Sequence, residues 1–408
     1  MLLLHLMSFL FPQKVRAIYV DHQLQSMSAA WGDFVFQTCQ QLQVPCSVVP
    51  VHVAEGNLEN QARTARYQAF ATHLKANEIL VLAHHQQDQA ETLMLRLLSG
   101  AGVQGLSAMS VLDQRENMTL WRPMLELSRE QICQWAAQLN VQNIQDPSNA
   151  DPDYDRAWCR EILWPVLQQR FPKMQQALTR TSILMQDADA ILQEVLQDDL
   201  LTCGNSRLLN LEALLNLSKP RQRQLLSVWM QGEAMYRPNF AMVERVLKEV
   251  IAAKPDAQAA LHWNGYYFVR YQQQIFRLTA QEYLAEQLHP IPLQQSVLWH
   301  QQEEVVLASG RYRITPQKQG LAASLLGREL TLSARIGGEK IHLLGRVGSW
   351  PLKKAIQQAQ IFPWLRHTIQ ILSIDNVMLG VFTPNGFWFA QSEYIEAEGW
   401  QPKLFSKQ

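Results

Sequence analysis

The 408-residue sequence has no excess of either charge, few cysteines and no long apolar run. Lys plus Arg number 36, as do Asp plus Glu, so a nucleic-acid partner can only be met by a local basic patch. The five cysteines include no Cys-X-X-Cys pair, which disfavours a disulfide framework and favours a reducing cytoplasm. No segment approaches the roughly twenty apolar residues that span a bilayer, so no membrane partner is expected.

The first third of the sequence alternates predicted helices and strands. The apolar opening, 1–11, has neither the basic lead-in nor the cleavage site of a signal peptide, and we expect a helix there. Segments 15–20, 46–53 and 79–83 are typical of strands, whereas 28–42, 58–74 and 89–98 are typical of helices. This alternation predicts an α/β fold with a parallel sheet and a ligand site at the carboxyl ends of its strands, where Asp21, His22, His84 and His85 lie.

The pattern changes after residue 165. Segments 171–201 and 208–250 are long and helical, and 266–271 with 274–278 predicts an appended hairpin. The last segment predicts a helix at 352–359 and strands at 369–374, 377–382 and 386–389. We therefore expect three domains: a parallel-sheet domain at 1–165, a mainly helical domain at 166–325 and a small α+β domain at 326–408.

Arginines and carboxylates cluster on two of the predicted helices. Arg63 and Arg66 lie within about one turn of each other, which suits phosphate or carboxylate binding, although a solvated helix edge gives the same pattern. Asp88 lies near the start of a helix, where a carboxylate caps the backbone. Asp88 and Glu91 are equally compatible with a Mg²⁺ ion that accompanies a nucleotide.

Other motifs are weaker. Gly100-Ala-Gly102-Val-Gln-Gly105 has the spelling of a dinucleotide site but follows a helix, so we interpret it as a helix end and a turn. The pair His84-His85 has no third ligand at a spacing suited to zinc. Residues 335–366 hold six basic side chains against the single acid Glu339, which is compatible with an RNA-backbone surface or with an ordinary basic face.

Motifs spread over nearly the whole chain, taken together and in order, resemble one known family. They are Ala17–Leu24, Glu59–Phe70, His84–Met109, Arg122-Pro123, Asp146-Pro-Ser-Asn149, Tyr154-Asp155-Arg156, Gly345-Arg346, Leu352-Lys353-Lys354 and Pro363–Arg366. On these residues the chain resembles the bacterial tRNA(Ile)-lysidine synthases of the PP-loop ATP pyrophosphatase superfamily. The resemblance implies a nucleotide-binding α/β domain followed by two smaller tRNA-binding domains.

The resemblance also implies a reaction, the ATP-dependent ligation of L-lysine to the wobble cytidine of an isoleucine tRNA with a CAU anticodon. ATP would adenylate the C2 oxygen of the cytidine, and the unprotonated lysine ε-amine would then displace AMP. Mg²⁺ would neutralise the triphosphate. Two alternatives stay open: another PP-loop tRNA-modifying enzyme, and a catalytically inactive tRNA-binding protein. A homodimer is a further expectation.

Residue by residue, the resemblance implies three groups of functional side chains. Asp88, Glu91 and Arg66 would be catalytic, with Asp88 also the Mg²⁺ ligand. ATP would be bound by Tyr19, Val20, Asp21, His22, Arg63, His84, Arg96 and Arg122. The tRNA would be bound by Arg156, Arg160, Arg346, Lys353, Lys354 and Arg366.

The sequence departs from the family in one important respect. The family's phosphate loop, Ser-Gly-Gly-X-Asp-Ser, is absent, and no substitute occurs. That loop supplies backbone donors for the pyrophosphate, so we expect weak ATP binding and a sheet without its first strand. Gln87 also replaces the first of two paired aspartates, and Ala157 replaces an asparagine. A start codon assigned at an internal methionine, which we favour, or a degenerate gene copy explains these departures.

Overall fold

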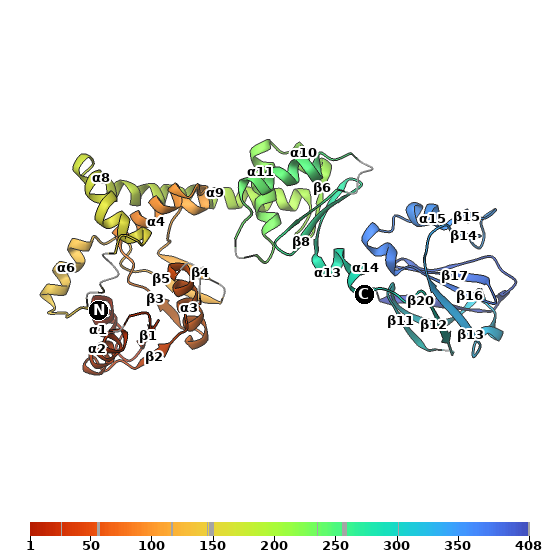
Figure 1. Cartoon of the computed structure of the whole chain (residues 1–408), viewed down its shortest axis with the longest axis horizontal. Helices are drawn as coiled ribbons and strands as arrows, with labels where there is room; N and C mark the ends of the chain where they lie inside the picture. The colour runs from red at the N-terminus through yellow and green to blue at the C-terminus, as the bar shows by residue number, and fades with distance from the viewer. Residues whose placement is uncertain are drawn as a thin grey trace. The chain divides into compact units, whose positions relative to one another are not determined.

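The computed structural model describes residues 1–25, 27–54, 58–115, 117–144, 146, 151–234, 236–254, 259–300 and 302–406, without the side chains of 58–60 (Figure 1). The expectations placed on the Glu59 side chain and on Pro147–Asn149 lie outside this described part of the chain. The chain forms two compact units, Met1–Val195 and Leu196–Gln408. No helix among the described residues is long and apolar enough to cross a membrane.

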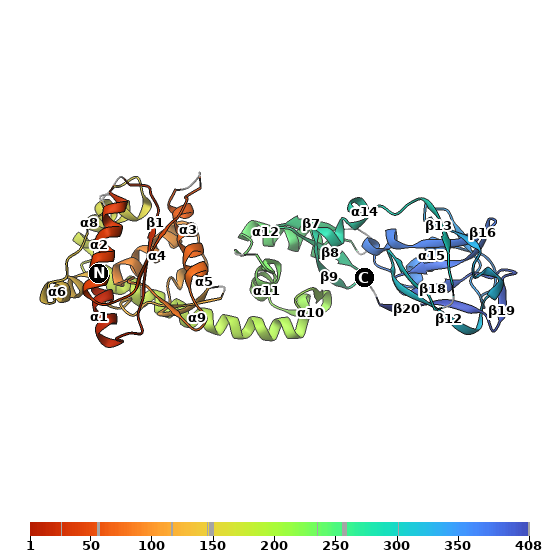
Figure 2. The ribbon, with the colours of Figure 1, turned by 90° about the horizontal axis from the view of Figure 1, so that it is seen from below.

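The first unit alternates strands and helices, as the sequence predicts. Helices α1 (Leu2–Leu10) and α2 (Ser28–Gln41) lie close together in both views (Figures 1 and 2). The strands are β1 (Ala17–Asp21), β2 (Cys46–Pro50), β3 (Ile79–Val81), β4 (Leu112–Arg115) and β5 (Met118–Trp121). The helices are α1 (Leu2–Leu10), α2 (Ser28–Gln41), α3 (Leu58–His73), α4 (Gln86–Leu98), α5 (Val103–Leu106), α6 (Arg129–Gln138), α7 (Asp155–Trp158), α8 (Trp164–Arg170) and α9 (Met174–Cys203), the last of which contains the boundary between the units.

The parallel strands of this unit form two sheets in the part of the chain that the structure describes. Strand β1 pairs in parallel with β2, and β3 pairs in parallel with β5, which β4 joins antiparallel. A cavity of about 570 Å³ lies between β1 and β3, lined by Ile18, Val81 and the α1 side chains Leu3, Leu4 and Met7. The pairs β1–β2 and β3–β5 confirm the predicted parallel pairing. The carboxyl ends of β1 and β3 border one pocket, which is described below as the candidate site.

Apolar side chains hold α3 against the second sheet. Tyr67 and Phe70 of α3 form one buried cluster with Leu80 of β3 and with Met118 and Leu120 of β5. Leu120 is fully buried, and burial of such a side chain stabilises the fold by roughly 1.5–3 kcal/mol. This packing fixes the face of α3 that carries its arginines relative to the end of β3.

The second unit contains a four-stranded antiparallel sheet in the order β6-β9-β8-β7, covered by helices. The predicted hairpin is confirmed as β8 and β9, and β6 and β7 extend it. Phe268 in this sheet is fully buried, with its ring centroid 5.7 Å from that of Trp229. The elements are β6 (Leu208–Asn210), α10 (Leu211–Asn216), α11 (Lys219–Gln231), α12 (Phe240–Arg245), β7 (Ala260–Trp263), β8 (Tyr266–Tyr271), β9 (Gln274–Thr279), α13 (Ala280–Tyr283) and α14 (Ala285–Leu288).

The rest of the second unit is a two-sheet sandwich with one helix. A five-stranded sheet, β10-β13-β16-β17-β18, faces a sheet of β11, β12, β19 and β20, and one apolar core, which includes Tyr312 and Phe382, contains residues of both sheets. Helix α15 (Leu352–Gln358) packs on β16 through Ile356 and Ile371. The strands are β10 (Gln294–Leu298), β11 (Glu304–Leu307), β12 (Gly310–Leu321), β13 (Glu329–Ala334), β14 (Lys340–Ile341), β15 (Trp350–Pro351), β16 (Gln370–Ile374), β17 (Val377–Thr383), β18 (Gly386–Phe389), β19 (Ile395–Ala397) and β20 (Trp400–Ser406).

The sequence analysis did not predict β10, β11 or β12. Strand β10 pairs with β13, and β12 pairs with β20, so these sheets extend across the expected boundary between residues 325 and 326. The reason is physical: a strand before the boundary buries its apolar face only against strands that come after it. The expected helix at 352–359 and the strands at 369–374, 377–382 and 386–389 are confirmed.

Candidate functional site

The carboxyl ends of β1 and β3 meet at one pocket. Its volume is about 690 Å³, and Asp21, His22 and His84, which end or follow these strands, line it together with Asp88 from α4. The expectation that the polar side chains at these strand ends share one hollow is confirmed for Asp21, His22 and His84, whereas His85 does not line the pocket and instead caps α4. Of the side chains predicted for the site, those that line this pocket are Tyr19, Val20, Asp21, His22, Arg63, Arg66, His84, Asp88, Arg156 and Arg160.

Asp88 caps helix α4. Its Oδ2 accepts a hydrogen bond from the backbone N–H of His85 at 3.0 Å, and the Nδ1 of His85 accepts one from the backbone N–H of Gln87 at 3.2 Å. These reciprocal bonds satisfy amide groups at the start of the helix that have no partner within it. The capping interpretation of Asp88 is thus confirmed, and its other oxygen, Oδ1, is directed toward Arg160.

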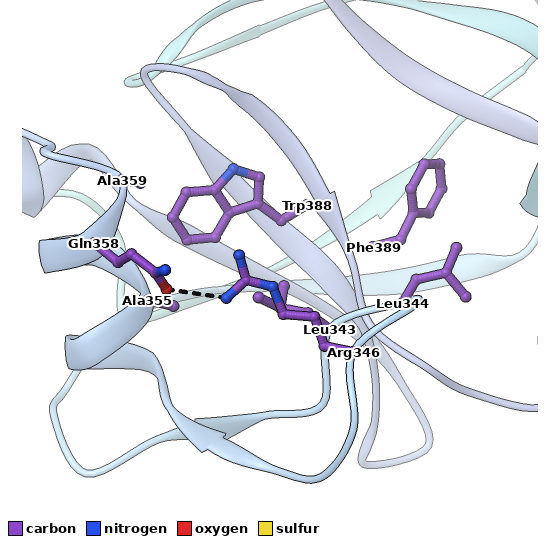
Figure 3. A pocket seen from close by; sticks show the side chains of 8 residues that line it. All are labelled: Leu343, Leu344, Arg346, Ala355, Gln358, Ala359, Trp388 and Phe389. Atoms are coloured by element: carbon purple, nitrogen blue, oxygen red, sulfur yellow. Dashed lines mark hydrogen bonds between the residues drawn. The ribbon is translucent and has the colours of Figure 1, made fainter.

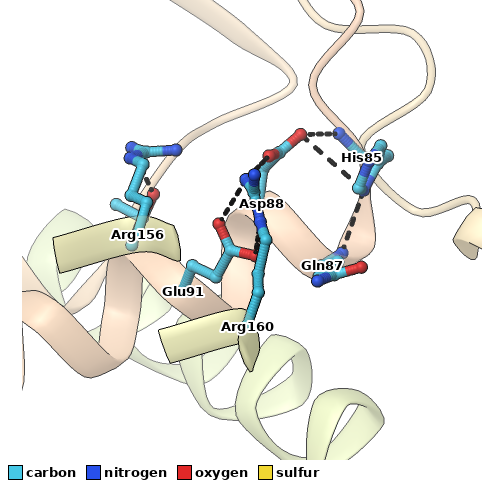
Figure 4. A network of polar contacts seen from close by, with 7 residues as sticks. His85, Gln87, Asp88, Glu91, Arg156 and Arg160 are labelled. Atoms are coloured by element: carbon cyan, nitrogen blue, oxygen red, sulfur yellow. Dashed lines mark hydrogen bonds and ion pairs between the residues drawn. The ribbon is translucent and has the colours of Figure 1, made fainter. Parts of the chain in front are cut away.

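Glu91, which is fully buried, and the partly exposed Arg160 form a bidentate ion pair one turn along α4 (Figure 4). The Nε of Arg160 donates to Glu91 Oε1 at 2.6 Å and its Nη2 to Oε2 at 2.8 Å, while Nη2 is 3.5 Å from Asp88 Oδ1. Glu91 is fully buried, and its hydrogen bonds raise the pKa of Arg160. Arg160 lies in the π-helical turn Cys159–Leu163, and such turns are frequent at functional sites.

Arg66 fixes the tautomer of His22. The Nε of Arg66 donates to His22 Nε2 at 3.3 Å, so the neutral ring carries its proton on Nδ1. Burial and the neighbouring Arg66 lower the pKa of His22, which keeps the imidazole neutral. That Nδ1 is buried and has no hydrogen-bond partner among the described residues. His22 therefore presents a hydrogen-bond donor without a protein acceptor in the pocket.

Arginines give the pocket a positive side. Burial lowers the pKa of Arg63, and the nearby charge of Arg156 lowers it further. Burial also lowers the pKa of His84 to about 4, an effect to which Arg122, Arg156 and Arg63 add and which Asp88 opposes. Like charges held together in a cleft attract anions, so this side suits phosphate or carboxylate groups.

The structure places two of the predicted nucleotide-binding arginines outside the pocket lining. Arg96 Nη1 donates to the backbone carbonyls of Gly105 and Ala108, both at 2.9 Å. Arg122 is 3% exposed, and its Nη1 donates to the carbonyl of Ser110 at 2.7 Å. Both guanidiniums thus donate hydrogen bonds to backbone carbonyls of the segment that connects α4 to β5. Gly100, with φ of +78°, follows α4 in the left-handed conformation, which confirms the predicted helix end.

The remaining predicted tRNA-binding residues belong to the second unit, in its sandwich. Lys353 and Lys354 lie on α15 and are exposed, and Arg346 precedes that helix. Arg366 is half-buried and donates from Nε to the carbonyl of Ile361 at 3.1 Å. By contrast, Arg156 and Arg160, which were predicted to bind tRNA, line the pocket of the first unit.

The sequence analysis missed part of the pocket lining. Ser28 and Trp31 reach it from α2, a helix that was assigned no function. Tyr154 and Asp146 also line it, and both belong to motifs of the resemblance although neither was predicted as a site residue. Tyr154 and Asp146 could have been found from the sequence, because both lie in motifs that carry the family resemblance. By contrast, the spacing of residues in α2 does not distinguish Trp31 from a side chain of the apolar core.

The described residues do not assemble a metal site of their own. They contain no group of three His, Cys, Asp or Glu side chains that could hold a metal ion. Arg160 contacts both Asp88 and Glu91, so these carboxylates are already paired with a cation. Mg²⁺ fits this pocket only as an ion whose other ligands are phosphate oxygens and water.

Three family models match this chain along its length. A PP-loop domain matches residues 1–167, a TilS substrate binding domain matches 209–276, and a TilS substrate C-terminal domain matches 330–400. The tRNA(Ile)-lysidine synthase of Acinetobacter baylyi is 62% identical over 411 residues, which cover 100% of this chain and 88% of that protein. The chain belongs to the tRNA(Ile)-lysidine synthase family. The synthase of Shigella flexneri is 34% identical over 96% of this chain and 90% of its own length.

A solved structure of the U34-tRNA thiolase NcsA from Methanococcus maripaludis also matches. It is 14% identical, covers 45% of this chain and 68% of its own, and has a TM-score of 0.38. We therefore assign the family from the sequence relatives and not from this structure. The PP-loop match and the parallel strand pairs establish the α/β fold of the first unit.

Proposed function

We propose that this chain joins L-lysine to the wobble cytidine of the isoleucine tRNA with a CAU anticodon, using ATP and forming lysidine. The observation that carries the proposal is the pocket that brings Asp21, Arg66, His84 and Asp88 together at the ends of two parallel strands. Membership of the lysidine synthase family supports the same reaction.

The reaction has two balanced steps. The C2 oxygen of the cytidine attacks the α-phosphate of ATP, and pyrophosphate leaves. The lysine ε-amine then attacks C2, AMP leaves with the oxygen, and the amine loses its protons to solvent or to a base. The amine reacts only when it is unprotonated, so the site must position it and keep competing water away.

Each side of the pocket suits one reactant. The positive side of Arg63, Arg66 and Arg156 binds the negatively charged phosphates. Asp88 Oδ1 is 3.5 Å from Arg160 Nη2, a weak contact that leaves this oxygen able to accept a hydrogen bond from the amine. A Mg²⁺ ion that accompanies the triphosphate would be held by Asp88, beside the contact of Asp88 with Arg160, and would neutralise phosphate charge. His22 Nδ1 donates to an acceptor on the nucleotide or on the cytosine ring.

The second unit supplies the surface for the rest of the tRNA. The match to substrate-binding domains at 209–276 and 330–400 supports this assignment, as does the basic segment with Lys353, Lys354 and Arg366. The cytoplasm, where tRNA and ATP meet, is the location that we propose. A homodimer is part of the proposal as well, and light scattering tests it.

Transfer of radiolabelled lysine to a CAU-anticodon isoleucine tRNA transcript tests the proposed function. We expect ATP-dependent transfer, and none to a matched transcript whose wobble cytidine is replaced by uridine. One AMP and one pyrophosphate should form for each lysidine. Retention of the tRNA without any transfer of label would contradict the proposal and would support an inactive tRNA-binding protein.

A further inference from the structure

A pocket in the sandwich of the second unit has no assigned function. Its volume is about 530 Å³, which lies within the range of small-ligand sites. Three segments form it: the loop that holds Leu343 and Arg346, helix α15 and strand β18 (Figure 3). The side chains that matter below are Leu343, Arg346, Ala355, Gln358, Ala359 and Trp388.

The lining combines one flat aromatic surface with two polar groups. Figure 3 shows the indole of Trp388 facing α15, with the guanidinium of Arg346 and the amide of Gln358 on the same side, whereas Phe389 points away from them. Trp388 is half-buried and packs on the apolar cluster beneath α15, so its ring is supported from below. Ala355 and Ala359 leave the space beside the ring open because their side chains are short.

Arg346 is held in place before any ligand binds. Its Nη1 donates to Gln358 Oε1 at 3.0 Å, and its Cζ lies 5.6 Å from the centroid of the Trp350 ring. His342 Nε2 is 2.8 Å from the carbonyl of Arg346, and Gly345, with φ of +78°, makes the turn that a residue with a side chain adopts only with strain. The backbone N–H of Leu344 donates to the backbone carbonyl of Phe389 at 3.0 Å. Such prior ordering reduces the entropy lost on binding.

The surroundings of the pocket carry positive charge. Lys353 and Lys354 are exposed on α15, the helix that forms one wall. Lysines of this kind contact phosphates without reading the sequence, whereas an aromatic face stacks on a base and a guanidinium and an amide hydrogen-bond its edge. A planar heterocycle attached to a phosphate backbone matches all three features.

We propose that this pocket binds one unpaired nucleobase of the tRNA, stacked on Trp388 and hydrogen-bonded by Arg346 and Gln358. The inference rests on the proposed function, because that function makes tRNA the substrate. The proposal adds a site for a single base to the segment that matches the TilS substrate C-terminal domain, a description that names no ligand pocket. The base is unpaired because the Trp388 ring needs a free base face on which to stack.

Equilibrium binding of full-length chain to tRNA, without ATP or lysine, tests the proposal. Trp388→Leu should weaken binding by about 5- to 150-fold, the range expected for one base stacked on an aromatic ring. Trp388→Phe should restore most of the affinity, and Arg346→Gln should weaken binding as well. Val347→Ala is the matched control, since Val347 is 95% exposed, adjoins Arg346 and does not line the pocket.

Salt dependence separates stacking from phosphate contact. The slope of log affinity against log salt should be the same for Trp388→Leu as for the parent chain, because no phosphate contact is lost. Lys353→Gln should reduce that slope by about one, because one fewer counterion is released. A reduced slope in Trp388→Leu would assign the loss of affinity to the backbone surface and would overturn the base-binding proposal.

Hydroxyl-radical footprinting of the unsubstituted chain covers the case in which Trp388→Leu fails to fold. Oxidation of Trp388 should fall when tRNA or a short single-stranded RNA is added, and it should not fall with the same RNA as a duplex. Equal oxidation with and without tRNA would overturn the proposal, as would equal protection by the single-stranded and the duplex RNA. Lysidine formation is not needed for these measurements, so its absence alone would contradict only the proposed function.

Discussion

Arg160 and Glu91 lie 69 residues apart in the sequence and form two parallel hydrogen bonds of 2.6 and 2.8 Å beneath the pocket. Glu91 has no exposed surface, whereas the side chain of Arg160 is 23% exposed. The carboxylate therefore depends on Arg160 for its charge balance, and the same guanidinium extends to Asp88. One ion pair links the stability of the first unit to the position of a predicted catalytic side chain.

Removal of Arg160 should destabilise the chain strongly. Arg160→Ala leaves the Glu91 carboxylate buried without its partner, and we expect the free energy of unfolding to fall by about 3–5 kcal/mol. Urea unfolding followed by circular dichroism measures the change. The control is Arg313→Ala, which breaks the Arg313–Glu304 pair between two half-exposed side chains and should cost less than about 1 kcal/mol. Equal losses for the two variants would show that Glu91 does not rely on Arg160.

Arg66 should affect lysidine formation more than stability. Arg66→Ala removes both a positive group and the donor that fixes the His22 tautomer, so we expect kcat/KM for lysidine formation to fall by about 100-fold or more. Arg66→Lys should recover little, because an ammonium ion does not reproduce the geometry of the guanidinium. Radiolabelled lysine transfer measures both variants. Arg129→Ala, an exposed arginine on α6 outside the pocket, is the control, and full activity in Arg66→Ala would contradict the role.

The strands that surround the site could be predicted because each is a short apolar run with a polar residue at its end. Asp21 and His84 could be placed together for that reason, since parallel strands bring their carboxyl ends to one edge. The Arg160–Glu91 pair could not, because no local spacing relates residues so far apart. Nor does the sequence show that Arg96 and Arg122 lie outside the pocket lining, because it reveals a guanidinium but not the backbone carbonyls to which that guanidinium donates.

Strands β10 and β12, which the sequence analysis did not predict, differ in how far the sequence alone could have revealed them. The burial pattern of β12 alternates from Gly310 to Ile314, with Tyr312 and Ile314 inside and Arg311 and Arg313 outside, and this alternation was readable in the sequence. Strand β10 alternates only between exposed and partly buried positions, and its sequence, Gln-Gln-Ser-Val-Leu, has no alternation of apolar and polar residues from which to predict it. Its position depends on pairing with β13, a tertiary interaction that propensity does not report.

Pyrophosphate should stabilise the first unit. Arg63 and Arg156 repel each other in the pocket, and an anion that binds between them relieves this repulsion and adds its binding free energy to the folded state. Millimolar pyrophosphate should raise Tm by about 2–4 °C for each kcal/mol gained. Differential scanning fluorimetry measures the shift, with sulfate at equal ionic strength as the control. Arg63→Gln should lose most of the shift, and an undiminished shift would place the anion elsewhere.

Acid should weaken the fold through His84. Burial and the nearby Arg122, Arg156 and Arg63 lower its pKa to about 4, against an ordinary value of 6.5, so the unfolded chain binds more protons than the folded chain between these two pH values. The free energy of unfolding should therefore fall as the pH drops from 6.5 toward 4, by up to roughly 1.4 kcal/mol per pH unit from this side chain. His84→Gln, which keeps a polar side chain that does not titrate, should flatten this part of the profile and leave stability above pH 7 nearly unchanged. Urea unfolding at pH 5 and pH 7.5 measures the difference, and equal slopes in the parent and variant chains would show that His84 titrates normally.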